Sequence, residues 1–345
     1  MISKLNPVTL AFIVMLVFLF TVPVVVRALP GDFSSAGQTD GLTVGWHRRS
    51  IEVDGLRRWF RVFVPRHDMA EMPVVLLLHG GGRGMNKILS KRGGAAREWP
   101  ELAKRERFLL LVPNGVNPNN GDPKGNRQHW NDLRGASSSV NSGTDDVSFL
   151  LHLLRWAHTT FRTDVKRVYV TGASNGGLMT YTMLIEHPEA FAAGAAFVAN
   201  LPVNAAQLRG TSRPVALMIV NGTDDPLMKY GGGAIPLGRG VVMSAKETAL
   251  WWAKANGADW NQVKTSRLPD RDPGDGCRIR VTRFPAGSAE AAPVHFYTMV
   301  GAGHAMPSRK HTSPDRWVVR RLIGPQCRDA EAAEMAWSFF RQFTR

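Results

Sequence analysis

The sequence contains little cysteine: Cys277 and Cys327 are the only two in a chain of 345 residues. Two thiols are too few for a disulfide-framework protein, or for a zinc or iron-sulfur protein whose site is built from several cysteines. A chain of this length buries most of its apolar surface without such support. Hydrophobic residues make up 44% and charged residues 21%, which excludes a disordered, collagen-like or multi-span membrane protein.

Acidic residues are also few, with 28 Asp and Glu against 43 Lys and Arg, which gives a formal charge of +15. The basic residues are dispersed, because the longest clusters are pairs such as Arg48-Arg49 and Arg320-Arg321. No basic run of the kind found in nucleic-acid-binding arms is present. We therefore expect no nucleic-acid partner and interpret the charge as a generally basic surface, one that could hold the protein on acidic polysaccharide.

One long apolar run, residues 8–26, follows Lys4 and precedes the small residue Ala28. This pattern predicts an export signal over residues 1–28. The same run is long enough to remain as an uncleaved membrane anchor. Both alternatives place residues 29–345 outside the cytoplasm, so we expect a secreted or periplasmic protein that contacts the membrane only if the segment is uncleaved. In an oxidising compartment the two cysteines either pair or remain as buried free thiols.

Short, continuous apolar runs recur through the rest of the chain, as in strands buried on both faces of a parallel sheet. Helical patterns alternate with these runs. Together they predict an α/β fold in a single domain, residues 29–345, with a mostly parallel central sheet and helices on both faces. The predicted buried strands are residues 74–78, 108–112, 168–170, 195–198 and 215–220, and the predicted helices are residues 146–161, 177–187, 244–256 and 329–343.

Ser174 is the candidate nucleophile. It lies in the pattern G-x-S-x-G, from Gly172 to Gly176, between a predicted strand and a predicted helix. This setting lifts a serine hydroxyl off the sheet and points the first helical N–H groups at a substrate carbonyl.

A glycine-rich segment, from His79 to Gly82, follows the first buried strand. Hydrolases of this architecture place the second arm of the oxyanion hole there. We expect the backbone N–H groups of Gly81, Gly82 and Asn175 to surround a developing oxyanion. A phosphate-binding loop is disfavoured, because no G-K-[ST] follows.

The catalytic acid and base are expected after two later strands. Asp224 and Asp225 both follow the strand at 215–220, and the pattern of residues alone does not decide between them. His304 follows a predicted strand at 294–300, whereas we interpret His295 and His311 as structural or surface residues. The order Ser, Asp, His along the chain is the order found in α/β hydrolases.

Across residues 50–343 the chain resembles the secreted α/β-hydrolase esterases that include feruloyl esterases, acetyl xylan esterases and polyhydroxybutyrate depolymerases. The resemblance implies that Asp225 is the catalytic acid. It also places Trp130 and Asn131 beside the substrate, although a buried structural role for Trp130 is the alternative. The motifs that carry it are His79-Gly80-Gly81-Gly82, Trp130-Asn131, Asp145-Asp146-Val147, Gly172-Ala173-Ser174-Asn175-Gly176-Gly177, Asn221-Gly222-Thr223-Asp224-Asp225-Pro226, Trp252 with Asn256-Gly257, and Gly301-Ala302-Gly303-His304.

The chain departs from this family in three places. Asn221 stands where relatives have histidine, His304 is followed by Ala305-Met306-Pro307, and Asp132-Leu133-Arg134 replaces a segment that carries cysteine in feruloyl-type members. Asp145 and Asp146 begin a predicted helix and are expected to cap it.

The sequence predicts a serine esterase that needs no metal or cofactor and acts on feruloyl or acetyl esters of plant polymers or on hydroxyalkanoate oligomers. Its partner is then a small or oligomeric ester, which a polysaccharide can carry. The alternatives are a serine peptidase on the same fold and an exported binding protein without activity. The second would be expected to lack Ser174 or His304, and both are present.

Overall fold

The computed structural model describes residues 42–68, 70–91, 93–135, 140, 143–207, 211–312 and 317–345. The chain divides into two units, Met1–Ala36 and Gly37–Arg345, and the first lies entirely outside the described residues. The predicted export signal, residues 1–28, and the predicted start of the domain at residue 29 therefore remain predictions. Among the described residues, no helix combines the length and apolar character needed to cross a bilayer.

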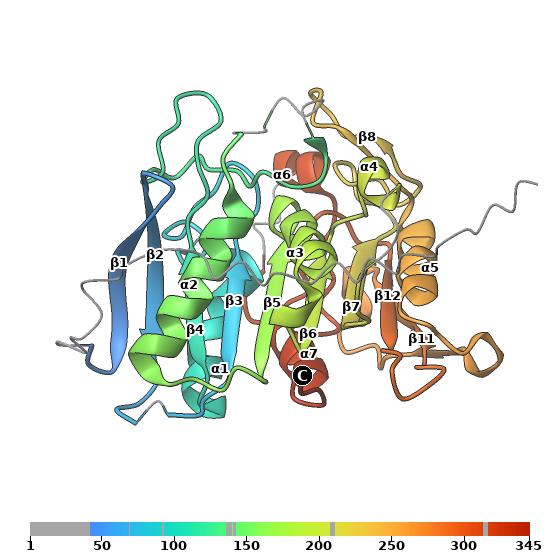
Figure 1. The fold of residues 1–345 in the computed structure, drawn as a ribbon. Coiled ribbons are helices and arrows are strands. Elements are labelled where there is room, and N and C mark those ends of the chain that lie inside the picture. Colours follow the sequence, from blue (N-terminus) through green and yellow to red (C-terminus); the bar gives the residue numbers. More distant parts are fainter. Residues whose placement is uncertain are drawn as a thin grey trace, which may run out of the picture. The chain divides into compact units, whose positions relative to one another are not determined.

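A ten-stranded mixed sheet runs through the second unit in the order β1-β2-β4-β3-β5-β6-β7-β12-β11-β10 (Figure 1). The six strands from β4 to β12 in this order are parallel to one another, and the pairs at both edges are antiparallel. The strands are β1 (Gly45–Val53), β2 (Leu56–Val64), β3 (Val74–Leu78), β4 (Leu109–Pro113), β5 (Val168–Ala173), β6 (Ala193–Phe197), β7 (Ala216–Gly222), β10 (Lys264–Arg267), β11 (Arg278–Phe284) and β12 (Val294–Val300), with β8 (Gly233–Ala234) and β9 (Val241–Val242) forming a separate pair.

Helices cover both faces of this sheet (Figure 1). One face packs against α2, α3 and α5 in a core that includes Phe149, Leu178 and Trp252, and the other packs against α1 and α7 in a core that includes Trp99 and Trp337. The helices are α1 (Trp99–Glu106), α2 (Asp146–Phe161), α3 (Asn175–Glu186), α4 (Val203–Ala206), α5 (Ala245–Ala255), α6 (Trp317–Ile323) and α7 (Ala332–Phe340), with short 3-10 helices at Gly94–Glu98, Pro188–Ala190, Trp260–Gln262 and Pro273–Asp275.

The predicted α/β architecture is confirmed, with a mostly parallel sheet and helices on both faces. The apolar runs became the central strands because every residue of β3, β4, β6 and β7 is buried. Two features had no signal in the sequence: β10, whose four residues are all exposed, and the small β8-β9 pair.

A disulfide joins Cys277 to Cys327, so the two cysteines are paired and are not buried free thiols. It links the residue that precedes β11 to the segment between α6 and α7. Both cysteines are almost completely buried, at 1% and 0% exposed.

Candidate active site

Ser174 lies at the sharp turn between β5 and α3, where its backbone adopts φ 56° and ψ −124°. Such a conformation costs about 1–3 kcal/mol for a residue other than glycine and is found mainly at functional sites. The neighbouring glycines make the turn feasible, because a Cβ on Gly176 would lie 2.4 Å from the Leu78 carbonyl oxygen. One on Gly172 would lie 2.5 Å from the carbonyl group of Gly176. The Ser174 N–H donates to Phe197 O at 2.9 Å, which holds the turn against β6.

Asp225 and His304 form a close pair. His304 Nδ1 lies 2.6 Å from Asp225 Oδ2, and the Asp225 side chain is 1% exposed. The other oxygen, Oδ1, accepts hydrogen bonds from the N–H groups of Leu227 and Met228 at 2.8 and 2.7 Å. The carboxylate is therefore fixed in direction, and a neutral His304 that donates from Nδ1 keeps Nε2 as a proton acceptor.

The loop that carries His304 is held by close backbone contacts. His304 N–H donates to Ile323 O at 2.5 Å, and Gly303 N–H donates to Pro325 O at 2.7 Å. A Cβ on Gly303 would lie only 2.2 Å from the Ile323 oxygen, so this position requires glycine. The base is thus positioned by the last residue of α6 and the segment that follows it.

Ser174 and His304 line the same cavity, which has a volume of about 320 Å³. Of the two aspartates after β7, only Asp225 meets His304. Asp224 is exposed, and its carboxylate accepts a hydrogen bond from Thr223 Oγ1 at 2.7 Å. His295 and His311 do not line this cavity, and His295 packs against Phe339.

The Gly80–Gly81 peptide has a fixed orientation beside Ser174. Gly80 O is 3.0 Å from His79 Nδ1 and accepts from Arg83 N–H at 3.2 Å. Because a trans peptide points its C=O and N–H in opposite directions, the Gly81 N–H faces away from these two donors. The Asn175 N–H, at the start of α3, has no partner within the helix. Gly81 and Asn175 both line the cavity.

The expectation for Gly82 is corrected. Its N–H donates to Gln128 O at 2.9 Å, and the residue does not line the cavity. A donor already held by a backbone carbonyl has no hydrogen left for an oxyanion.

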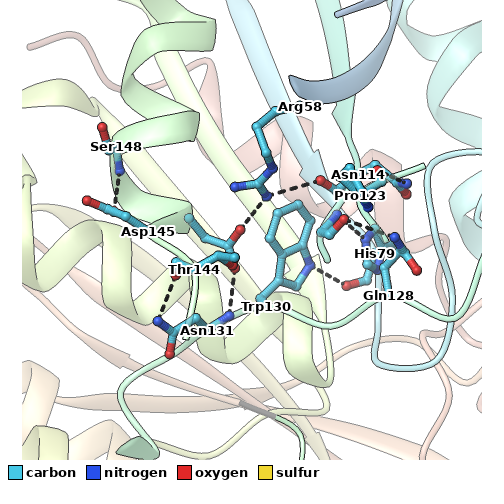
Figure 2. A network of polar contacts seen from close by, with 12 residues as sticks. Arg58, His79, Asn114, Pro123, Gln128, Trp130, Asn131, Thr144, Asp145 and Ser148 are labelled. Atoms are coloured by element: carbon cyan, nitrogen blue, oxygen red, sulfur yellow. Dashed lines mark hydrogen bonds and ion pairs between the residues drawn. The ribbon is translucent and has the colours of Figure 1, made fainter. Parts of the chain in front are cut away.

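The structure places Trp130 and Asn131 in a supporting hydrogen-bond network and not in the lining of the cavity. Trp130 is fully buried, its Nε1–H donates to His79 O at 2.8 Å, and neither residue lines the cavity. Asn131 donates from Nδ2 to Thr144 O and from its backbone to Asp146 Oδ2, both at 2.7 Å. Figure 2 shows both residues in a polar network that also contains Arg58 and His79. Trp130 thus supports the glycine-rich loop that begins at His79, in agreement with the alternative of a buried structural role.

Asp145 and Asp146 at the start of α2 have different roles. Asp145 caps the helix, since its side chain accepts a hydrogen bond from Ser148 N–H. Asp146 is buried and forms an ion pair with the buried Arg58, so the capping expectation is correct for the first residue only. Removing one partner of such a pair leaves an uncompensated buried charge.

A second buried network, centred on Asp132, was not identified from the sequence as part of the site. Asn175 Nδ2 donates to Asp132 Oδ2 at 2.7 Å, and Arg134 binds both oxygens of Asp132 at 2.8–3.0 Å. Arg134 also donates to Arg239 O at 2.9 Å. The available signal was the departure at Asp132-Leu133-Arg134, where opposite charges lie two residues apart.

Asn221, the other departure beside the site, is structural. It is 1% exposed, and its Nδ2 donates to Ala199 O and to Asn200 Oδ1. The described residues contain one cluster of three groups with metal-ligand chemistry, Cys277, Cys327 and Asp329. Because its two sulfurs form the disulfide, no thiolate is available there.

Burial lowers the pKa of His79 to about 3, since the ring is fully buried. Its Nε2 accepts a hydrogen bond from Gly115 N–H at 3.0 Å, which requires the neutral ring with the proton on Nδ1. The unfolded chain takes up a proton near pH 6.5 but the folded chain does not, so stability is full above that pH and falls as the pH is lowered towards 3.

We expect His79 alone to reduce the free energy of unfolding by about 2 kcal/mol between about pH 7.5 and pH 5. Urea unfolding at both pH values measures this difference in the native protein and in His79→Asn. The free energy of unfolding of His79→Asn should depend less on pH, whatever its absolute stability. As a control, His187→Asn removes a histidine that is partly exposed to solvent and should keep the native pH dependence. An unchanged slope in His79→Asn would contradict the assignment.

Comparisons with known proteins support this architecture. The family model described as the prolyl oligopeptidase family matches residues 136–209, which include Ser174. NocK of Nocardia uniformis subsp. tsuyamanensis, to which esterase activity is provisionally ascribed, is 26% identical over 75% of this chain and 74% of its own length. Feruloyl esterase B of Neurospora crassa is 28% identical over 39% of this chain and 41% of its own length. Bifunctional acetylxylan esterase/xylanase XynS20E of Neocallimastix patriciarum is 27% identical over 51% of this chain, and the match spans 22% of that protein.

Among solved structures, the acetyl xylan esterase from Aspergillus awamori superimposes with a TM-score of 0.52 and 17% identity, over 76% of this chain and 96% of that one. A thermostable esterase superimposes with a TM-score of 0.50 and 15% identity, over 87% and 63%. These structures agree with the sheet and helix layers described above. The chain therefore has the α/β-hydrolase fold of these structures, and the relatives that it resembles in sequence are described as esterases.

Proposed function

We propose that this protein is a serine esterase in which Ser174 is the nucleophile, His304 the general base and Asp225 the residue that orients His304. The observation that carries the proposal is the Asp225–His304 pair, at 2.6 Å, on the cavity that also contains the strained Ser174 turn. Acyl transfer needs this combination of a serine hydroxyl on a cavity and an oriented base.

The reaction proceeds in two steps. His304 Nε2 takes the hydroxyl proton as Ser174 Oγ attacks the ester carbonyl, and the N–H groups of Gly81 and Asn175 stabilise the oxyanion. Collapse breaks the bond to the alcohol, which leaves with the proton from His304, and an acyl-serine remains. Water, deprotonated by His304, then attacks the acyl-serine, releases the carboxylic acid and restores the Ser174 hydroxyl.

For the substrate we propose feruloyl or acetyl esters of plant polymers, or hydroxyalkanoate oligomers. The similarity to acetylxylan and feruloyl esterases supports the first class. We also propose export, through cleavage or anchoring of residues 1–28. A disulfide between Cys277 and Cys327 supports this, because disulfides persist mainly in oxidising compartments.

A peptidase activity is the second candidate, because the matching family model is that of prolyl oligopeptidases. Its match covers residues 136–209, around the Ser174 turn that esterases and peptidases share. His304 and most of the cavity lining lie outside that segment.

A matched pair of substrates distinguishes the two candidates: p-nitrophenyl butyrate and butyryl-p-nitroanilide, together with a prolyl p-nitroanilide peptide. We expect hydrolysis of the ester and no measurable hydrolysis of either anilide. Comparable rates on the prolyl anilide would replace the esterase proposal by the peptidase, and no turnover of any substrate would contradict both. Methyl ferulate, acetylated xylan and hydroxybutyrate oligomers then rank the ester classes.

A further inference from the structure

The cavity beside Ser174 is lined by basic residues. Three arginines contribute to it, Arg83, Arg134 and Arg239, and none of its described lining residues is Asp or Glu. A cleft that carries one sign of charge concentrates ligands of the opposite sign. Neutral acetyl and feruloyl groups give no reason for three guanidinium groups around a cavity of about 320 Å³.

The charge of Arg134 is already compensated. Asp132, 6% exposed, accepts from Arg134 Nε and Nη2, and Arg134 is itself 4% exposed. The remaining Nη1 donates to Arg239 O at 2.9 Å. Arg134 therefore acts on the site by holding the backbone of Arg239, which lies beside it in the cavity wall.

Arg239 is partly buried, and within the described part of the chain its guanidinium has no hydrogen-bond or ion-pair partner. Its charge reaches the site: the pKa of His129 is lowered to about 4, first by burial and then by Arg239 and Arg134. The His129 ring lies against Gly81, where a Cβ would approach it to 2.8 Å. The charge of Arg239 therefore acts on the part of the cavity wall beside the proposed oxyanion donor.

The backbone of Arg239 is tied to the nucleophile turn by buried polar contacts. Asn175, next to Ser174, donates to Asp132, Asp132 binds Arg134, and Arg134 binds Arg239 O. A buried ion pair contributes little net stability, but it specifies geometry. Here it fixes the backbone of Arg239 relative to Ser174, while the Arg239 guanidinium has no partner within the described residues, which is the arrangement expected of a binding residue.

We propose that Arg239 binds a carboxylate carried by the substrate, so that the enzyme prefers esters with an acidic group near the scissile bond. This inference rests on the proposed esterase function. A planar guanidinium binds a carboxylate through two parallel hydrogen bonds, which adds directional selectivity to charge attraction. The carboxylate can come from the alcohol side, as in a hydroxyalkanoate oligomer with its terminal acid, or from the acyl side, as in a half-ester of a dicarboxylic acid.

Two substrate pairs separate these sources. The 3-hydroxybutyrate dimer is compared with its terminal primary amide, and monoethyl succinate with ethyl succinamate. Each pair exchanges a carboxylate for a neutral group of nearly the same shape. We expect kcat/KM to favour the acid of at least one pair by about tenfold or more, and added salt to reduce that preference.

Arg239→Gln should bring the acid-to-amide ratio close to one, and Arg239→Lys should leave an intermediate ratio. Folding should survive both changes, because Arg134 contacts the backbone oxygen of Arg239 and not its side chain. Arg57→Gln removes the same charge from the exposed side of β2 and should keep the native ratio. A native ratio near one for both pairs, or a preference that persists in Arg239→Gln, would overturn the proposal.

These measurements distinguish a failure of the Arg239 proposal from a failure of the esterase proposal. A protein that hydrolyses acids and amides equally contradicts only the role of Arg239, whereas a protein that hydrolyses none of these esters contradicts the esterase. In the second case calorimetric binding of the hydroxybutyrate dimer to Ser174→Ala still tests Arg239. Binding that Arg239→Gln weakens about tenfold supports the carboxylate site, and equal binding contradicts it.

Discussion

Replacing Ser174 with alanine is expected to lower kcat/KM for p-nitrophenyl butyrate by about 10⁵-fold, leaving the slow turnover that binding and the oxyanion donors support. The change removes the attacking oxygen and leaves the other residues of the cavity lining in place. Alanine also keeps the Ser174 N–H bond to Phe197 O, so the turn should fold. Steady-state kinetics measure the loss, and unfolding curves should show an unchanged fold.

His304→Ala is expected to cost nearly as much, and Ser174→Ala with His304→Ala no more than the worse single variant, because the residues act as one unit. The controls are Ser266→Ala, on the exposed strand β10, and His187→Ala. Both controls should keep native rates. Full turnover in either single variant would remove that residue from the mechanism, and additive losses would show that the two act in separate steps.

Removing the disulfide by Cys277→Ala with Cys327→Ala is expected to reduce the free energy of unfolding by about 4 kcal/mol. The two cysteines are 50 residues apart in the sequence, so the bond restricts a large loop in the unfolded chain. The loss should also reach the site, because Cys327 closely follows the Ile323 and Pro325 carbonyls that hold the His304 loop.

Urea unfolding followed by fluorescence, with and without dithiothreitol, measures this effect. The native protein should shift to a lower midpoint in the reductant, the double variant should have that low midpoint in both conditions, and kcat should fall in the variant. Since both sulfurs are buried, brief exposure of the folded protein to reductant should leave activity unchanged. Urea midpoints that change neither with the substitutions nor with the reductant would contradict a stabilising disulfide.

The strands and the Ser174 turn could be predicted because their signals are local. A fully buried strand reads as a continuous apolar run, and the turn needs glycines at Gly172 and Gly176, where a Cβ would collide with backbone. The place of His304 after its strand followed from the same strand-by-strand pattern. The choice between Asp224 and Asp225 could not be made from this pattern, because it depends on which carboxylate turns towards His304. The family resemblance favoured Asp225.

The errors have a common physical cause. Gly82 was assigned from its place in the glycine-rich segment and Trp130 from the family resemblance, but their roles depend on where the loop at residues 128–130 returns across the site. There Gln128 O takes the Gly82 N–H, and the Trp130 indole reaches His79 O. Such contacts between distant segments leave no periodic pattern in the chain.

Arg239 was missed for a related reason. In the sequence it is one of 43 basic residues on a strongly positive protein. Its distinction is structural: Arg239 lines the Ser174 cavity, its carbonyl is held by Arg134, and its guanidinium has no carboxylate partner among the described residues. Only the folded chain separates this cation from those on the surface.

The central claim is tested most directly by locating the acyl group during turnover. Rapid acid quench of the native protein with p-nitrophenyl butyrate, followed by peptide mass spectrometry, should find one butyryl group on Ser174, formed in a burst with stoichiometric p-nitrophenol. His304→Ala should greatly slow its formation. A butyryl group on another residue, or turnover without any covalent intermediate on Ser174, would contradict the account.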